Sequence, residues 1–385
     1  KTLPMRAHMR RIVLRRCFFM VREYDISVIF GGVSSENEVS VITGTMACNV
    51  LKKGGKSVLP VYITQEGEML ADERLADIAL YKEGRLGGMS SLSFVRGGAL
   101  ILNARGKVKA RAKIGVILNC CHGGDGEGGA IAALAALSGI PFASAGLFES
   151  AAFMDKYLTK LILSGLGVGI VPYVYARSRR DALSSVGALG YPVIVKPSTL
   201  GSSIGISRAD DEESLSAALD VAFSLDSSVI IERYVSPRRE INCAAYYEGG
   251  KVVLSPCEEV FTTGDLLSYS DKYSGGGRRQ FPADLDEESK NFILNQTARV
   301  YGALNMRGIV RFDYIMCGKD IYISEINTVP GSLSQYLVSA DYFSFCRVLE
   351  KIIATARADF AEKISKRIIR TGILNNIVPN ACKIK

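Results

Sequence analysis

The arrangement of predicted strands changes near the middle of this 385-residue chain, and that change limits the possible folds more than any other feature. From residue 25 to about 145, apolar strands such as Asp25–Phe30 and Ser57–Ile63 alternate with helices such as Ser34–Lys53. This alternation is typical of a parallel α/β domain. Later strands come in pairs around short turns and indicate antiparallel α+β structure. Residues 66–112 are expected to hold a helix, loops and one short strand.

One of these strand pairs, residues 309–327, carries four polar side chains. Residues two apart on a strand share a face, so Arg311 lies with Asp313, and Glu325 lies with Asn327. A connection of three residues would place Asp313 opposite Glu325 and Arg311 opposite Asn327, whereas an even number would separate them. Such a face suits Mg²⁺ together with phosphate oxygens. A solvated face with an ordinary Arg–Asp ion pair is the alternative.

A glycine- and serine-rich loop follows the strand that ends at Lys196. Gly201 and Gly205 permit close approach of the backbone to an anion, and Ser202 and Ser203 add hydroxyl and amide donors. The loop is not a P-loop, because the lysine precedes the glycines. An ordinary turn is the alternative interpretation.

Two residues lie where a helix begins or a strand ends, and both could face a ligand. Glu36 follows a Gly-Gly turn at the start of a helix, where residues 35–38 fit a capping box, so it could bind a ligand or only complement the helix dipole. His122 is the one histidine after residue 19 and ends a strand of the α/β sheet, where such sheets bind ligands. A buried structural histidine is the alternative.

Residues 262–280 are rich in serine, glycine and arginine and contain Lys272 and Tyr273. This composition suits a mobile loop over an active site. A connector without a role in chemistry is the alternative reading of the same composition.

Charge and cysteine usage exclude several classes of protein. Residues 1–19 carry six basic side chains and no acid, so they hold six of the eight net positive charges. A nucleic-acid-binding protein should keep that surplus in its folded part. This segment is either a targeting arm or sequence upstream of a start at Met20. The nine cysteines are an odd number and include no C-x-x-C pair, which argues against a disulfide framework and a zinc ribbon and favours a reducing cytosol. No stretch reads as a membrane span.

The motifs occur together and in order, and in this arrangement the chain resembles the D-alanine–D-alanine ligases of the ATP-grasp superfamily. The matching segments run from about residue 25 to 345: Phe30–Ser40, His122–Glu127, Met154–Lys156, Val195–Pro197, Gly201–Ser203, Glu232, Glu240, Lys272–Tyr273, Arg311–Asp313 and Glu325–Gly331.

The resemblance implies an ATP-grasp fold in which an N-terminal parallel α/β domain precedes two α+β subdomains. The expected segments are a disordered basic extension (1–19), the N-terminal domain (20–145), a central lid domain (146–235), a C-terminal domain (236–370) and a tail (371–385).

The resemblance also implies a reaction. ATP would activate one D-alanine carboxylate as an acyl phosphate, and the amine of a second D-alanine would attack it. The products would be D-alanyl-D-alanine, ADP and phosphate, and the dipeptide would serve peptidoglycan precursor synthesis in the bacterial cytoplasm. The partners would be small molecules rather than nucleic acid or membrane, and the enzyme would be a homodimer.

Roles carry over to the residues that match the family motifs. The catalytic residues would be Glu36, Ser202, Tyr273, Arg311 and Gly331. The substrate-binding residues would be Glu36, His122, Tyr336 and Leu337. ATP would contact Lys156, Lys196, Ser203, Glu232, Arg233, Val235, Glu240 and Lys272. Two Mg²⁺ ions, with Mn²⁺ as the alternative ion, would bind Asp313, Glu325 and Asn327.

Several positions depart from the family pattern and leave the second substrate open. Gly128 replaces a usual aspartate, Tyr336 replaces a usual serine, and Leu267 and Asp271 replace tyrosine and alanine. Tyr273 itself accompanies dipeptide formation in the family. The alternatives are a ligase that makes D-Ala-D-Ser, a non-catalytic ATP-binding relative, and a nucleic-acid binder that depends on the basic extension.

Overall fold

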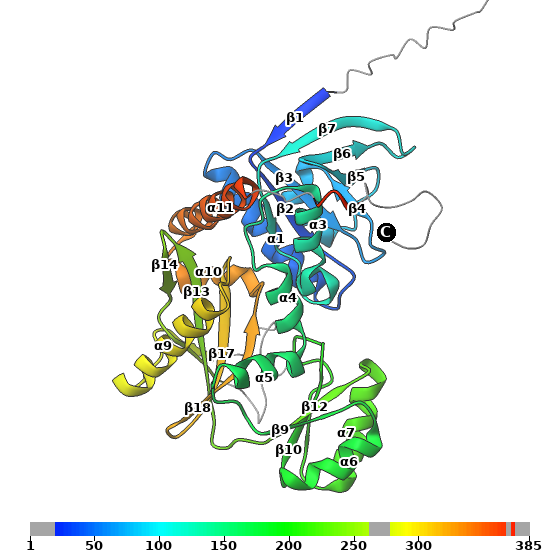
Figure 1. The fold of residues 1–385 in the computed structure, drawn as a ribbon. Helices are drawn as coiled ribbons and strands as arrows, with labels where there is room; N and C mark the ends of the chain where they lie inside the picture. Colours follow the sequence, from blue (N-terminus) through cyan, green and yellow to red (C-terminus); the bar gives the residue numbers. More distant parts are fainter. Residues whose placement is uncertain (1–19, 262–277, 367–370, 374–385) are drawn as a thin grey trace, which may run out of the picture.

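Three β-sheets organise the fold, and the computed structural model describes residues 20–261, 278–366 and 371–373. Figure 1 shows the first sheet at the top, the second at the lower right and the third to the left of centre. The predicted extension 1–19 and most of the predicted tail 371–385 lie outside the described residues.

The first sheet has eight strands in the order β1-β7-β6-β5-β4-β3-β2-β8. Their bounds are β1 (Met20–Tyr24), β2 (Ile26–Gly31), β3 (Val58–Ile63), β4 (Met69–Ala71), β5 (Ser90–Val95), β6 (Gly98–Leu102), β7 (Val108–Ile114) and β8 (Ile117–Asn119). β2 pairs in parallel with β3 and β8, as the strand–helix alternation predicted.

The rest of this sheet corrects the expectation of a purely parallel arrangement. From β3 through β4, β5 and β6 to β7, all neighbouring strands are antiparallel. The prediction of one short strand in residues 66–112 is therefore wrong. Along Val108–Ile114 the buried positions alternate with exposed lysine and arginine, because one face of this strand is covered and the other meets water.

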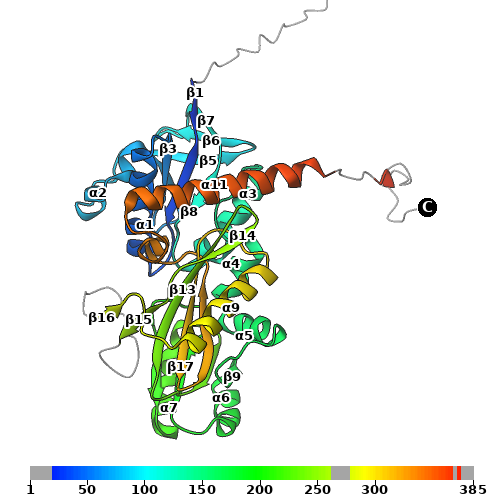
Figure 2. The same ribbon diagram turned by 90° about the vertical axis from the view of Figure 1, so that its left-hand side faces the viewer.

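Helices cover both faces of the first sheet. α1 (Asn37–Lys53) and the long C-terminal α11 (Tyr342–Ser365) share one core with the sheet, in which Val28, Leu51 and Phe345 are buried together. α3 (Ile131–Ser138) belongs to the other core, with Ile29. Figure 2 shows α11 running across this part of the molecule. Within the described ranges, no helix has the length and apolar character to cross a bilayer.

The second sheet is small and entirely antiparallel, in the order β11-β10-β12-β9. Its strands and helices are β9 (Tyr173–Ala176), α6 (Arg179–Ser185), β10 (Val193–Pro197), β11 (Ser207–Ala209), α7 (Glu212–Leu225) and β12 (Val229–Arg233). Its own core includes Val195, Leu219 and Ile231. The strand that carries Lys196 is therefore supported by a separate packed unit.

The third sheet runs β16-β15-β13-β17-β18, and β14 pairs with β13. The strands are β13 (Arg239–Glu248), β14 (Lys251–Leu254), β15 (Glu258–Phe261), β16 (Arg278–Gln280), β17 (Val310–Cys317) and β18 (Asp320–Asn327). The remaining helices are α2 (Ala79–Lys82), α4 (Leu147–Met154), α5 (Lys156–Gly165), α9 (Glu287–Ala303) and α10 (Gln335–Val338). α4, α5 and α9 contribute Phe153, Leu163 and Ile293 to the core under this sheet.

The β17–β18 pair forms the polar face that the sequence predicted, although by a different route. Arg311 lies opposite Asn327, and Asp313 lies opposite Glu325, so the predicted pairing is confirmed. The connection, however, has two residues rather than three, because Cys317 already pairs with Asp320. A β-bulge at Ser324 shifts the register by one residue and restores the pairing that an even connection would have destroyed.

Candidate active site

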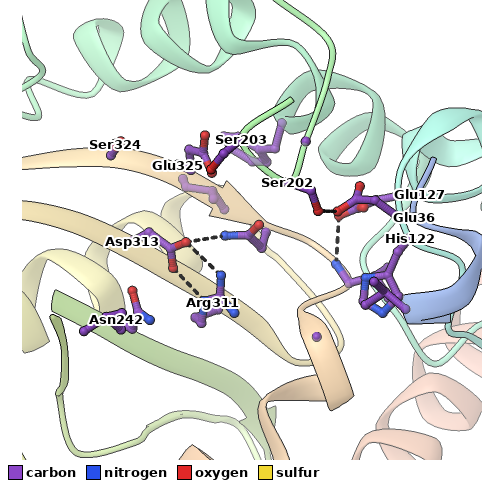
Figure 3. Close-up of a pocket in the computed structure, with 18 of the residues that line it drawn as sticks. Glu36, His122, Glu127, Ser202, Ser203, Asn242, Arg311, Asp313, Ser324 and Glu325 are labelled. Carbon is purple, nitrogen blue, oxygen red and sulfur yellow. Dashed lines mark hydrogen bonds and ion pairs between the residues drawn. The ribbon is translucent and has the colours of Figure 1, made fainter. Parts of the chain in front are cut away.

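All three sheets contribute to one cavity of about 460 Å³. The first sheet and its helices supply Glu36 and His122, the second supplies Lys196, and the third supplies Arg311 and Asp313. Figure 3 shows Glu36 and His122 on one side of this cavity and Arg311 and Asp313 on the other. Residues far apart in the sequence thus meet where the three units join.

Glu36 lies at the start of α1, and its carboxylate accepts a hydrogen bond from the Ser202 hydroxyl. The predicted capping box is wrong, because no side chain caps this helix end. The Ser34 hydroxyl instead accepts from the Glu36 amide at 3.0 Å. Two glycines make room for the carboxylate, since a Cβ on Gly123 or Gly201 would lie 2.6 or 2.7 Å from Glu36 Oε2. The Gly/Ser loop and the His122 loop therefore close around Glu36.

His122 is buried and forms a hydrogen bond of 2.9 Å between Nε2 and the Thr43 hydroxyl. Burial, assisted by the charge of Arg311, lowers the pKa of His122 to about 3. The imidazole is therefore neutral near pH 7 and acts as a hydrogen-bonding group rather than a cation. The same Thr43 oxygen accepts from the Ser332 amide at 3.0 Å, which joins the histidine to the turn that follows β18.

The turn whose Ser332 amide donates to Thr43 has an unusual backbone. Ser332, Leu333 and Ser334 follow Gly331 in sequence, and all three have φ near +50°. Non-glycine residues rarely adopt this conformation, which costs of order 1 kcal/mol or more each. Packing and hydrogen bonds from elsewhere must therefore hold this turn, and it lines the cavity at Gly331 and Ser332.

Glu127 also lines the cavity, and the sequence interpretation gave it no role. Its carboxylate accepts from the Gly123 amide at 2.8 Å and from the Val329 amide at 3.4 Å. Burial raises the pKa of Glu127 to about 7, and Glu36 contributes to the rise, while the two amides and Arg311 oppose it. Its position five residues after His122 in the matched motif was the available signal.

The four-residue face of the third sheet lies on the opposite wall. Arg311 donates to both oxygens of Asp313, at 2.7 and 2.8 Å, and the Asn327 amide donates to Asp313 at 2.9 Å. Arg311 stays charged, since its pKa is raised: burial opposes the rise, but Asp313 outweighs it. The Arg–Asp pair of the alternative interpretation is present, but the two side chains are only about one-fifth exposed and line a cavity.

The donor set on this wall is compatible with Mg²⁺. Asp313 and Glu325 are cross-strand partners, and Asn327 lies beside them. Hard cations accept one or two carboxylates, an amide oxygen and phosphate oxygens. The described residues contain no group of three His, Cys, Asp or Glu side chains that could hold a metal alone. A cation here would therefore need further oxygen ligands, from phosphate or water.

Lys156 begins α5, and the cap of that helix fixes its position. Asp155 accepts from the Tyr157 and Leu158 amides and also from the Ser198 hydroxyl at 3.1 Å. This bond ties the helix start to the loop that follows β10. The Lys156 ammonium donates to the Leu200 carbonyl at 2.5 Å and faces the cavity.

Lys196, which lines the cavity, forms a buried cluster with Lys160 and Glu232, which do not line it. Each lysine ammonium is 2.6 Å from the Glu232 carboxylate. Burial alone would raise the pKa of Glu232, but the two ammonium groups outweigh it and lower the pKa to about 2. The sequence interpretation missed Lys160, although it lies four residues after Lys156 on the same helix face.

The other predicted site residues fall into three groups. Lining the cavity are Ser203, Glu240, Gly331 and Tyr336. Outside its lining are Glu232, Arg233, Val235 and Leu337. Beyond the described residues are Leu267, Asp271, Lys272 and Tyr273.

Glu240, one of the predicted ATP contacts, forms an ion pair of 2.6 Å with Arg238. Sequence reasoning also missed Arg238 and Arg279, which line the cavity.

Comparison with known proteins gives matches over most of the chain. A family model described as "D-ala D-ala ligase N-terminus" matches residues 25–145, and one described as "D-ala D-ala ligase C-terminus" matches residues 162–354. A D-alanine–D-alanine ligase of Thermosipho africanus is 34% identical over 358 residues, which is 89% of this chain and 95% of that protein.

Solved structures are similar in fold. The D-alanine–D-alanine ligase of Helicobacter pylori matches with a TM-score of 0.71 and 25% identity, covering 86% of this chain and 98% of that one. The VanG D-Ala:D-Ser ligase of Enterococcus faecalis matches with a TM-score of 0.73 and 24% identity, covering 87% and 100%. The second likeness concerns the fold alone.

Proposed function

The chain belongs to the D-alanine–D-alanine ligase family, and we propose that the cavity described above is where it joins two D-alanine molecules at the expense of ATP. The enzyme is an ATP-dependent ligase of the ATP-grasp type. One observation carries the assignment of the site: a single cavity brings Glu36 of the first unit, Lys196 of the second and the Asp313–Glu325 pair of the third together.

The first D-alanine binds at the Glu36 side. The Glu36 carboxylate attracts its ammonium group, and Ser202 holds the carboxylate in place. His122, which is neutral and buried, supplies a hydrogen bond to the substrate carboxylate without adding a charge. This arrangement aims the carboxylate of the first D-alanine toward the opposite wall of the cavity, where the phosphate-binding residues lie.

The phosphates of ATP bind between Lys156, Lys196 and the third sheet. The carboxylates of Asp313 and Glu325 with Asn327 hold Mg²⁺, and Glu240 contacts the ribose. Bound there, Mg²⁺ supplies charge neutralisation for the phosphate oxygens. Glu232 and the backbone near residues 233–235 bind the adenine from outside the cavity lining, and Lys272 approaches the γ-phosphate.

Catalysis follows from positioning and charge. A carboxylate oxygen of the first D-alanine attacks the γ-phosphorus, and ADP leaves. The neutral amine of the second D-alanine then attacks the acyl carbon. The nitrogen gives its proton to a phosphate oxygen, and the bond between the acyl carbon and the phosphate oxygen breaks as the amide forms. Arg311 and the Gly331 amide stabilise the negative oxygen that forms, and one such donor is typically worth about 3–4 kcal/mol. A loop that bears Tyr273 excludes water from the acyl phosphate.

The second substrate binds near Tyr336 and Leu337. Tyr336 replaces the serine usual in the family and changes the shape of this pocket, and D-serine is the second candidate for this position. We also propose a cytoplasmic homodimer.

The experiment measures phosphate release from ATP, with and without Mg²⁺ and D-alanine, together with the mass of the product. D-alanine-dependent release with D-alanyl-D-alanine as the product supports the proposal. A product formed only with D-serine would support the second candidate, and no turnover with any D-amino acid would indicate a non-catalytic ATP-binding protein.

A matched pair of variants tests the first-substrate site. Glu36→Gln should lower kcat/KM for D-alanine by at least about 100-fold, because it removes the charge that binds the ammonium group. Glu38→Gln changes an exposed carboxyl two residues along the same helix and should leave the rate within twofold. Equal rates for the two variants would refute the role of Glu36.

A further inference from the structure

The β15–β16 pair brings one of two adjacent arginines to the cavity. Arg279 pairs with Val260, and both residues line the cavity. Arg278 pairs with Phe261, and its guanidinium lies 5.1 Å from the centre of that ring. Because successive residues on a strand face opposite sides, only the Arg279 side of this pair is turned toward the site.

Two contacts orient the Arg279 side chain. Its Nη1 lies 3.4 Å from Glu258 Oε1, and its guanidinium lies 5.3 Å from the centre of the Tyr336 ring. The Glu258 side chain is 2% exposed, whereas that of Arg279 is 43% exposed. A buried carboxylate thus anchors one terminal nitrogen, and a planar group with five N–H donors retains capacity for another acceptor.

Glu258 is itself held in place. It accepts from the Asn242 amide at 3.2 Å. Burial raises the pKa of Glu258, while the charges of Arg279 and Arg311 oppose that rise, so both guanidinium groups lie within electrostatic reach of it. Arg311 already donates to both oxygens of Asp313. Of these two arginines, Arg279 is the one with the more exposed side chain.

The reaction requires a site for a second anion. The first amino acid loses its carboxylate charge when it becomes an acyl phosphate and then an amide. The second amino acid reacts through its amine, so its carboxylate remains charged from binding to product. A carboxylate in a partly enclosed cavity needs a cation or several donors nearby.

We propose that Arg279, set in place by Glu258 and Tyr336, binds the carboxylate of the second amino acid and thereby selects an α-amino acid at that position. This inference rests on the proposed function, since it assigns one residue within that site. The planar guanidinium matches the two oxygens of a carboxylate, so an amine or amino alcohol of the same size lacks the group that Arg279 binds.

The experiment compares Arg279→Gln, Arg279→Lys and the matched control Arg278→Gln. Dipeptide formation is measured over a wide range of D-alanine concentrations, so that the two D-alanine KM values are separated, and phosphate release is measured in parallel. Arg279→Gln should raise the KM of the second D-alanine about 10- to 100-fold, with the KM of ATP and of the first D-alanine within twofold. Arg279→Lys keeps the charge and should recover part of the loss.

The ratio of phosphate to dipeptide separates binding from a general structural defect. If the second amine is poorly held, acyl phosphate still forms, and water that enters in place of the second amino acid hydrolyses it, so the Arg279→Gln variant should release more phosphate than dipeptide. Arg278→Gln should keep the wild-type ratio.

Three results would overturn the inference: a second-site KM within twofold of wild type in Arg279→Gln, the same rise in Arg278→Gln, or an equal rise in every KM. Absence of dipeptide from the wild-type chain would refute the proposed function, and this assignment with it.

Discussion

Glu127 provides a test of the site that needs no substrate. Its carboxylate bridges the His122 loop and the segment that follows β18 through the Gly123 and Val329 amides. Burial holds its pKa at about 7, against an ordinary value of 4.5. Between pH 4.5 and pH 7, therefore, Glu127 holds a proton in the folded protein that it has lost in the unfolded chain.

The size and the sign of the effect follow from this difference. A difference of about 2.5 between the two pKa values, at about 1.4 kcal/mol for each unit, corresponds to roughly 3 kcal/mol, which is an upper limit because Glu127 is only partly buried. A raised pKa favours the protonated form in the folded state. The corresponding stability is fully present below pH 4.5, is lost as the pH rises to 7, and stays lost above that.

Glu127→Gln removes this titration while keeping the shape and one acceptor oxygen. The free energy of unfolding should therefore increase in the variant relative to wild type by up to about 3 kcal/mol between pH 4.5 and pH 8. Urea unfolding of both proteins at pH 4.5, 6 and 8 measures it, with Glu38→Gln as the exposed control. A difference between variant and wild type that does not change with pH, or that falls as the pH rises, would show that Glu127 is not held protonated by the fold.

Two other buried groups give measurable effects. Thr43→Val removes the hydroxyl that accepts from the Ser332 amide and bonds to the His122 imidazole, so kcat/KM should fall about 10- to 100-fold. Thr45→Val is the control: its hydroxyl donates to a carbonyl of its own helix, and kcat/KM should change less than threefold. Equal falls in kcat/KM for the two variants would argue against a role for the hydrogen bonds of Thr43. Lys160→Met leaves Glu232 with one lysine partner, so the free energy of unfolding in urea at pH 7 should fall by about 3 kcal/mol, and the KM for ATP should rise. An unchanged midpoint of urea unfolding would contradict a stabilising role for this buried cluster.

Local sequence signals located much of the site. Lys196 and the serines after it stand at a strand end, where a glycine-rich loop can approach a ligand, and the structure places Lys196, Ser202 and Ser203 around the cavity. The same kind of signal was present but overlooked in residues 108–114, where alternating charge marks a strand. These features are predictable because they depend on neighbours in the sequence.

Glu127 and Thr43 illustrate what could not be predicted. Each accepts a hydrogen bond from a backbone amide of residues 329 to 332, which are about 200 or more positions away in the sequence. The turn at residues 332–334 adopts a left-handed conformation that no glycine or other local sequence signal requires. Lys160 is an intermediate case, since its spacing from Lys156 gives its helix face while its partner Glu232 comes from another sheet. Tertiary packing decides these positions.

The Ser324 bulge shows why the prediction of the polar face succeeded despite a wrong turn length. With a two-residue connection, an unbroken ladder would turn Glu325 toward the core, where an unpaired carboxylate costs several kcal/mol. The buried residues of β18 show the same shift in register. Ile323 and Ile326 are both buried although they are three positions apart, whereas residues of a regular strand share a face at every second position. That three-residue spacing requires one extra residue between them, and Ser324 supplies it. The spacing of buried residues, rather than the length of the turn, therefore determines which polar side chains share a face in this hairpin.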